Sequence, residues 1–180
     1  MGQYYHAYTK NAAEERVWSL QCTNFTTTRN FDWYMGLKLT EHSWYGNILT
    51  DAISFYLYKN PTQLAWVGDY AKEAEVYQKC WGNDDDVNEY HYEVTDAPFD
   101  YTRKWAVNHT TQEAFALDKP TGEGWVIYPL SLLTAIGNGK GGGDYYGPSQ
   151  MIGKWAMNII SIEDEVPEGY AIIMPPNFTE

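Results

Sequence analysis

The segment from Gly137 to Gly147 holds the residues best suited to chemistry in this sequence. Five glycines, one lysine and one aspartate lie between positions 137 and 144, directly after the apolar run 127–136. Glycine allows backbone conformations and close approaches that other residues forbid. The loop is therefore either a tight structural crossing or a surface where the backbone touches a ligand. In the second case, backbone N–H groups and Lys140 would cradle a phosphate or carboxylate. The candidate ligand-binding residues are Gly139, Lys140, Gly141, Gly142, Gly143, Asp144 and Tyr145 of the loop, with Trp66 and Asp69 from elsewhere.

Neither common phosphate-binding motif is complete in this loop. The P-loop requires Ser or Thr after its lysine, whereas Gly141 follows Lys140. Glycines at 137, 139 and 142 have the spacing GxGxxG, but dinucleotide binding requires that motif inside a strand–turn–helix unit. Residues 144–148 do not begin a convincing helix. The sequence therefore predicts no cofactor, and a structural crossing remains the simpler interpretation of the loop.

Four residues are candidates for acid–base catalysis: His42, Asp69, His109 and Asp144. Asp69 follows an apolar segment, so its carboxylate either caps a helix or faces a pocket at the end of a strand. General acid–base chemistry requires these side chains to share one cleft, which the sequence alone does not establish. No two histidines stand at metal-ligand spacing, so no metal site is predicted. Whether the protein is an enzyme stays open.

Aromatic residues are unusually frequent, at 17% of the chain, with eight Trp and sixteen Tyr. Many stand in adjacent pairs, such as Tyr4-Tyr5 and Tyr145-Tyr146. Neighbouring residues on a strand face opposite sides, so one ring of each pair is expected at the surface. An exposed ring beside a glycine loop can stack on a base or pack against a partner. A core with ordinary surface tyrosines is the alternative.

The charge excludes some classes of partner. The net charge is −12 and the isoelectric point about 4.6, which disfavours nucleic acid and anionic membranes. No apolar run reaches the length of a membrane span, and the first residues lack the pattern of a signal peptide. The two cysteines, Cys22 and Cys80, read as free thiols. We expect a cytoplasmic protein whose partner is a small molecule or another protein, with oligomerisation open.

The strands and helices that would position these residues can be predicted from the sequence pattern. They indicate one α+β domain over 1–180, with a mostly antiparallel sheet and two or three helices. Strands are expected at 3–8, 17–22, 36–41, 64–67, 101–107, 114–118, 125–128, 154–162 and 170–174. The fifth and sixth should form a hairpin, and the last two a closing hairpin around an acidic turn.

Two helices are expected, and a third is left open. Asn47 caps the first, whose apolar residues recur at helical spacing until Asn60-Pro61 ends it. Asp69 caps a second, over 70–81. Residues 129–136 are ambiguous, but the proline at their start favours a short third helix that Gly137 ends.

Several blocks of the chain, in order, resemble a scattered family of uncharacterised bacterial and viral proteins that begin Met-Gly-Gln-Tyr-Tyr. The matching blocks are 1–5, 36–43, 66–71, 107–110, the glycine loop through Tyr145, and 153–156. The resemblance implies a cytoplasmic protein of a bacterium or its phage, and a phage accessory protein that counters host defence would fit. It implies no activity and no catalytic residue.

Three functional hypotheses follow. The leading one is a small-ligand-binding protein, whose glycine-loop pocket is lined by aromatic rings and takes a nucleotide-like or other anionic ligand. The second is an acidic inhibitor that occupies a basic surface of a host protein. The third is a small enzyme that uses the four His and Asp candidates.

Overall fold

The computed structural model describes residues 2–10, 17–21, 38–41, 43–71, 87–91, 97–120, 126–139, 142–147, 150–175 and 178. Within these ranges, 17–21 and 87–91 are described by their backbone alone.

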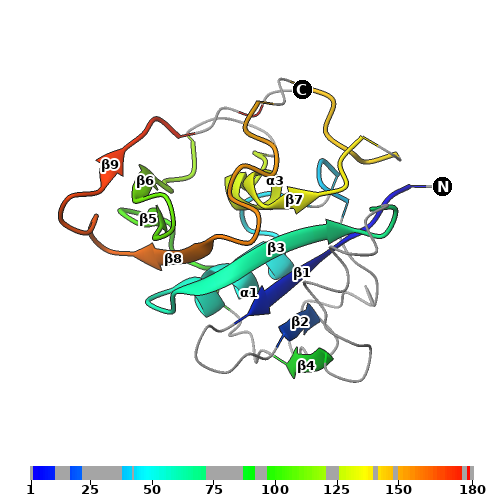
Figure 1. Cartoon of the computed structure of the whole chain (residues 1–180), viewed down its shortest axis with the longest axis horizontal. Coiled ribbons are helices and arrows are strands. Elements are labelled where there is room, and N and C mark those ends of the chain that lie inside the picture. The colour runs from blue at the N-terminus through cyan, green and yellow to red at the C-terminus, as the bar shows by residue number, and fades with distance from the viewer. Residues whose placement is uncertain are drawn as a thin grey trace.

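The described strands form one mixed sheet (Figure 1). Their bounds are β1 Tyr5–Lys10, β2 Val17–Gln21, β3 Thr62–Gly68, β4 Val87–His91, β5 Trp105–Asn108, β6 Glu113–Ala116, β7 Ala135–Ile136, β8 Ile159–Glu163 and β9 Ala171–Ile172. Their order is β4-β2-β1-β3-β8-β5-β6-β9, with β7 also beside β3. The pairs β2–β4, β3–β7 and β6–β9 are parallel and the others antiparallel. Many strands with few helices fit the α+β class, but the expectation of a mostly antiparallel sheet is correct only in part.

Strand β3 lies at the centre and organises both sides of the sheet. One of its edges pairs with β1, while the other pairs with β8 at its beginning and with β7 at its end. Leu64 and Trp66 face the main core, whereas Ala65 and Val67 face a smaller apolar cluster on the opposite side. Burial on both faces explains why this strand reads as an unbroken apolar run.

Helix α1, Ile48–Leu57, begins where the sequence predicts. The side chain of Asn47 accepts a hydrogen bond from the backbone N–H of Leu49 at 2.9 Å, as an N-cap does. Ile53 and Leu57 belong to the same buried cluster as Trp66 of β3. The helix lies behind β1 and β3 in Figure 1 and thus covers one face of the sheet.

The segment after residue 128 forms a shorter helix than expected. Helix α3 spans Pro129–Leu133, and β7 follows after a single residue. The backbone N–H of Trp66 donates to the carbonyl of Thr134 at 2.9 Å, which starts the pairing with β3. The prediction of a helix to residue 136 is therefore wrong at its end, because Ala135 and Ile136 pair with the edge of β3 as a strand instead of continuing the helix.

The predicted hairpin of 101–107 and 114–118 is confirmed as β5 and β6, which pair antiparallel. The predicted closing hairpin is wrong. Strand β8 pairs with β3 and β5, whereas β9 lies parallel to β6, so other strands separate them. Residues 154–157 are turns, with Met157 at φ 63°, and the strand begins only at Ile159.

Two other strand predictions are wrong in their described parts. Residues 39–41 form a turn, whose Thr40 N–H donates to the carbonyl of Gly143 rather than to a strand. Within 126–128 the sheet-like contact is an isolated bridge from Ile127 to Trp44. Residues 72–81 of the helix predicted over 70–81 lie outside the described residues, as do Cys22 and Cys80.

Candidate functional site

The glycine-rich loop is fastened to the body of the protein by its carbonyl groups. The backbone N–H of Gln3 donates to the carbonyl of Gly142 at 3.0 Å, and the Gln3 side-chain amide donates to the carbonyl of Gly137 at 3.1 Å. On the other side, the N–H of Thr40 donates to the carbonyl of Gly143 at 3.2 Å. The loop therefore lies between the N-terminal strand and the turn at 38–41.

Asp144 and Tyr145 continue this anchoring into the interior, where each side chain is 2% exposed. The Tyr5 hydroxyl donates a hydrogen bond to Asp144 Oδ1. Burial and this neighbouring carboxylate raise the pKa of Tyr5 far above its usual range. Asn138 closes the loop, because its amide donates to the Tyr145 carbonyl at 2.9 Å and accepts from the Tyr145 N–H at 2.8 Å.

Close packing explains the need for glycine at two positions. Gly143 has a φ of +88°, and an added Cβ would lie 2.6 Å from the Lys38 side chain, whose methylene groups cross the loop. Gly137 has a φ of +94°, and an added Cβ would lie 2.8 Å from Ala71. These glycines serve the structural crossing that the sequence left as the simpler interpretation.

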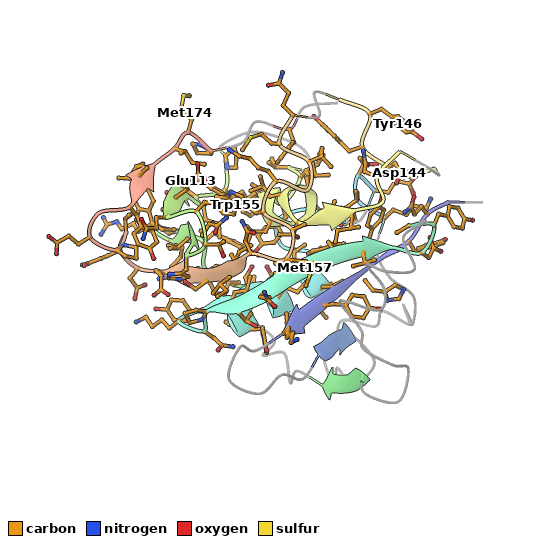
Figure 2. All side chains as sticks on the ribbon, in the orientation of Figure 1. Glu113, Asp144, Tyr146, Trp155, Met157 and Met174 are labelled. Atoms are coloured by element: carbon orange, nitrogen blue, oxygen red, sulfur yellow. The ribbon has the colours of Figure 1, made fainter. Side chains whose placement is uncertain are left out.

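The outward part of the loop has a different character. Tyr146 is 76% exposed, and Figure 2 shows its ring directed away from the body, close to Asp144. Gly139 is exposed, has a φ of +94°, and has open space where a Cβ would point. We call Gly139 and Tyr146 the loop rim. Sequence reasoning did not select Tyr146 as a site residue, although its pairing with Tyr145 predicted one exposed ring.

The other two predicted ligand-binding residues, Trp66 and Asp69, lie outside the loop, on β3 and in the turn that follows it. Trp66 is fully buried in the core, and its indole N–H has no hydrogen-bond partner among the described residues. Asp69 is exposed in the turn after β3, where its carboxylate accepts from the backbone N–H of Tyr4 at 3.1 Å. Lys140, Gly141 and His42 are outside the described residues.

His109 directly follows β5 and contacts residues of β8 and of the segment before β9. Strands β5 and β9 are at the left of Figure 1, whereas Asp144 is at the right of Figure 2, which has the same orientation. Its Nε2 is 2.8 Å from Ser161 Oγ, and its Nδ1 is 3.1 Å from the Tyr170 hydroxyl. Ser161 in turn donates to Glu163 at 2.6 Å. Because Ser161 gives its proton to Glu163, it accepts from Nε2–H, and Tyr170 then donates to Nδ1. The structure therefore does not bring His109 to Asp69 and Asp144.

A second polar cluster lies inside the core beside α1, and sequence reasoning missed it. Tyr101 donates to the buried carboxylate of Asp51 at 2.8 Å, while Ser54 Oγ lies 3.1 Å from the Tyr101 hydroxyl and 2.8 Å from that of Tyr128. Burial raises the pKa of both Tyr101 and Tyr128. Asp51 and Ser54 stand three positions apart on the buried side of α1, a spacing that could have indicated this cluster.

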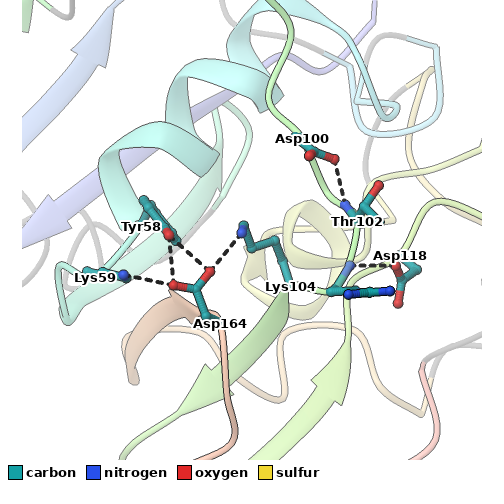
Figure 3. A network of polar contacts seen from close by, with 8 residues as sticks. Tyr58, Lys59, Asp100, Thr102, Lys104, Asp118 and Asp164 are labelled. Carbon is teal, nitrogen blue, oxygen red and sulfur yellow. Dashed lines mark hydrogen bonds and ion pairs between the residues drawn. The ribbon is translucent and has the colours of Figure 1, made fainter.

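An ionic cluster on the surface joins α1 to β5 and β8 (Figure 3). Asp164 accepts from Lys59 and Lys104, each at 2.7 Å, and from the Tyr58 hydroxyl at 2.9 Å. These donors, with Lys104 the largest contributor, hold the pKa of Asp164 below its usual range. The cluster links these elements at the solvent-exposed surface. Its carboxylate, Asp164, already accepts from Lys59, Lys104 and Tyr58 of the same chain.

No group of three His, Cys, Asp or Glu side chains within the described ranges could hold a metal ion. Across those ranges, no helix combines the length and apolar composition needed to cross a membrane. No protein-family model, curated protein or solved structure matches this chain. The resemblance to bacterial and viral proteins therefore stays a prediction.

Proposed function

We propose that this protein binds a small anionic ligand with a planar group at the loop rim. The observation that carries the proposal is the contrast within three consecutive residues, where Asp144 and Tyr145 are buried and Tyr146 is 76% exposed. An aromatic ring held outside on an anchored segment loses little freedom when a ligand stacks on it.

Polar groups beside the loop rim support the proposal that the ligand carries an anionic group. The Gly137 carbonyl points to Gln3, so the N–H of the same trans peptide, on Asn138, points away from Gln3. The Lys38 side chain crosses the loop, and its ammonium lies 2.6 Å from Glu41, so an anionic ligand would share this cation with the Glu41 carboxylate. Lys140 remains the second cation proposed from the sequence. A nucleotide-like molecule has both the planar group and the anionic group that this rim would take.

A titration with ADP and with inorganic phosphate, followed by calorimetry, tests the proposal. ADP should bind saturably, Tyr146→Phe should retain binding, and Tyr146→Ala should weaken it about tenfold, as expected for one lost stacking contact. Tyr70→Ala is the matched control, because Tyr70 is also exposed but lies outside the loop. No response to ADP, or equal binding by Tyr146→Ala, would overturn the proposal.

Native mass spectrometry of the purified protein complements the titration. A carried-over small molecule that is lost in Tyr146→Ala would identify the ligand class directly. In the biological setting that the resemblance implies, the protein would be a cytoplasmic accessory protein of a bacterium or phage, and ligand capture would be its means of acting there.

A further inference from the structure

Strand β9 is at the end of the sheet order, beyond β6. The N–H groups of Ala171 and Ile173 donate to the carbonyls of Gln112 and Ala114, at 2.9 and 2.8 Å. Backbone groups alternate along an extended strand, so those of Ile172 and Met174 point away from β6. No described strand pairs with that outer edge.

The side chains along this edge are unusual for a sheet margin. Ile173 packs against the main core, whereas Ile172 is 65% and Met174 88% exposed. Figure 2 shows Met174 directed outward at the end of the molecule away from Tyr146. Protein surfaces usually protect such an edge with charge or cover it, because an open edge with apolar side chains pairs with other chains.

The charge around the edge indicates what kind of chain it would take. From Trp155 to the last residue the sequence has five acidic residues and no Lys, Arg or His. Glu165 and Glu168 are exposed in the turn that leads into β9, and neither forms an ion pair with the described residues. On the inner side of β9, Lys154 lies 3.9 Å from Glu113, the residue opposite Ala171.

We propose that the outer edge of β9 binds an extended, basic segment of another protein by adding it to the sheet as a further strand. Main-chain hydrogen bonds to Ile172 and Met174 supply the pairing, and their side chains cover apolar residues of the segment. Lysine or arginine side chains of the segment meet Glu165 and Glu168. A second copy of this chain is not the proposed partner, because two copies that each carry a net charge of −12 repel one another. This site is separate from the loop rim, so either proposal can fail alone.

Fluorescence anisotropy of a labelled peptide of alternating valine and lysine tests the edge on the full chain. Saturable binding is expected, weaker in high salt, with a valine–glutamate peptide as the non-binding control. Ile172→Pro removes an N–H that points outward and keeps the bonds to β6, so it should weaken binding about tenfold. Ile172→Thr keeps that N–H and should weaken binding less. Thermal unfolding of each variant checks that the fold is retained.

Backbone amide chemical shifts locate the bound peptide. Changes centred on Ile172 and Met174 are expected. The proposal is overturned if the peptide does not bind, if folded Ile172→Pro binds it equally, if the shifts centre on another strand, or if the protein alone forms a dimer that Ile172→Pro dissociates.

Discussion

The hydroxyl of Tyr5 donates a hydrogen bond to the carboxylate of Asp144, 139 positions further along the chain. Both side chains are buried, so this contact fixes the end of the glycine-rich loop against the first strand of the sheet. Because Tyr146 follows two residues later, its exposed ring depends on this anchor for its position.

Tyr5→Phe should lower the free energy of unfolding by about 1–3 kcal/mol, because the buried Oδ1 of Asp144 loses this donor. Urea denaturation measures the change. Tyr70→Phe serves as control and should be nearly neutral, since Tyr70 lies at the surface. Equal stability of the two variants would show that the Tyr5–Asp144 contact contributes nothing.

Gly143→Ala should be more destabilising than Gly142→Ala. Alanine at Gly143 keeps a left-handed φ of +88°, at a cost of roughly 1–2 kcal/mol, and its Cβ displaces the Lys38 side chain. At Gly142 the nearest atom to an added Cβ is 3.7 Å away and φ is not in the left-handed region. Thermal unfolding of the two variants makes the comparison, and the reverse order would contradict the described packing.

Ser54→Ala should lower the free energy of unfolding by about 1–3 kcal/mol, because the buried Tyr128 hydroxyl loses the oxygen that accepts its hydrogen bond, whereas Tyr101 keeps its bond to Asp51. Combining it with Tyr128→Phe gives a double-mutant cycle. The joint effect should be smaller than the sum of the separate effects, since both changes remove the same hydrogen bond. Strict additivity would argue against a direct contact.

Stability should fall as the pH falls through about 6.5, the ordinary pKa of histidine. Burial lowers the pKa of His6 and of His109 in the folded state. The unfolded chain then binds more protons than the folded one, so the free energy of unfolding decreases until the pH passes the folded-state pKa values. His109→Gln should flatten this dependence in urea titrations, with His6→Gln as the companion variant. If the free energy of unfolding of His109→Gln changed with pH as steeply as that of the unsubstituted protein, His109 would not contribute to the pH dependence.

Asp164→Asn should lower the midpoint of thermal unfolding less than Tyr5→Phe does. Its ion pairs with Lys59 and Lys104 are exposed to solvent, which weakens them, and added salt screens what remains. The difference from the unsubstituted protein should therefore shrink in high salt. A large effect that persists in salt would mean that Asp164 acts through packing.

The elements that depend on neighbouring residues were predictable. Asn47 predicts the start of helix α1, because an N-cap bonds to a backbone N–H within three residues of it. The β5–β6 hairpin is predicted by two apolar segments on either side of a polar turn. The continuous apolar run of β3 also indicated a buried strand. In the candidate site, the sequence indicated the glycine loop and the exposure of one ring in Tyr145-Tyr146, but not which ring.

The sequence by itself determined the acidic surface, the first helix, the hairpin and the position of the glycine loop, because composition and local spacing suffice for each. Only the tertiary structure decided that β7 replaces the last turn of a helix, that Asp144 is buried against Tyr5 and that Tyr146 is outside. It also placed β9 at an open edge instead of in a hairpin with β8. These outcomes depend on pairings between segments far apart in the chain, for which short-range patterns carry no information.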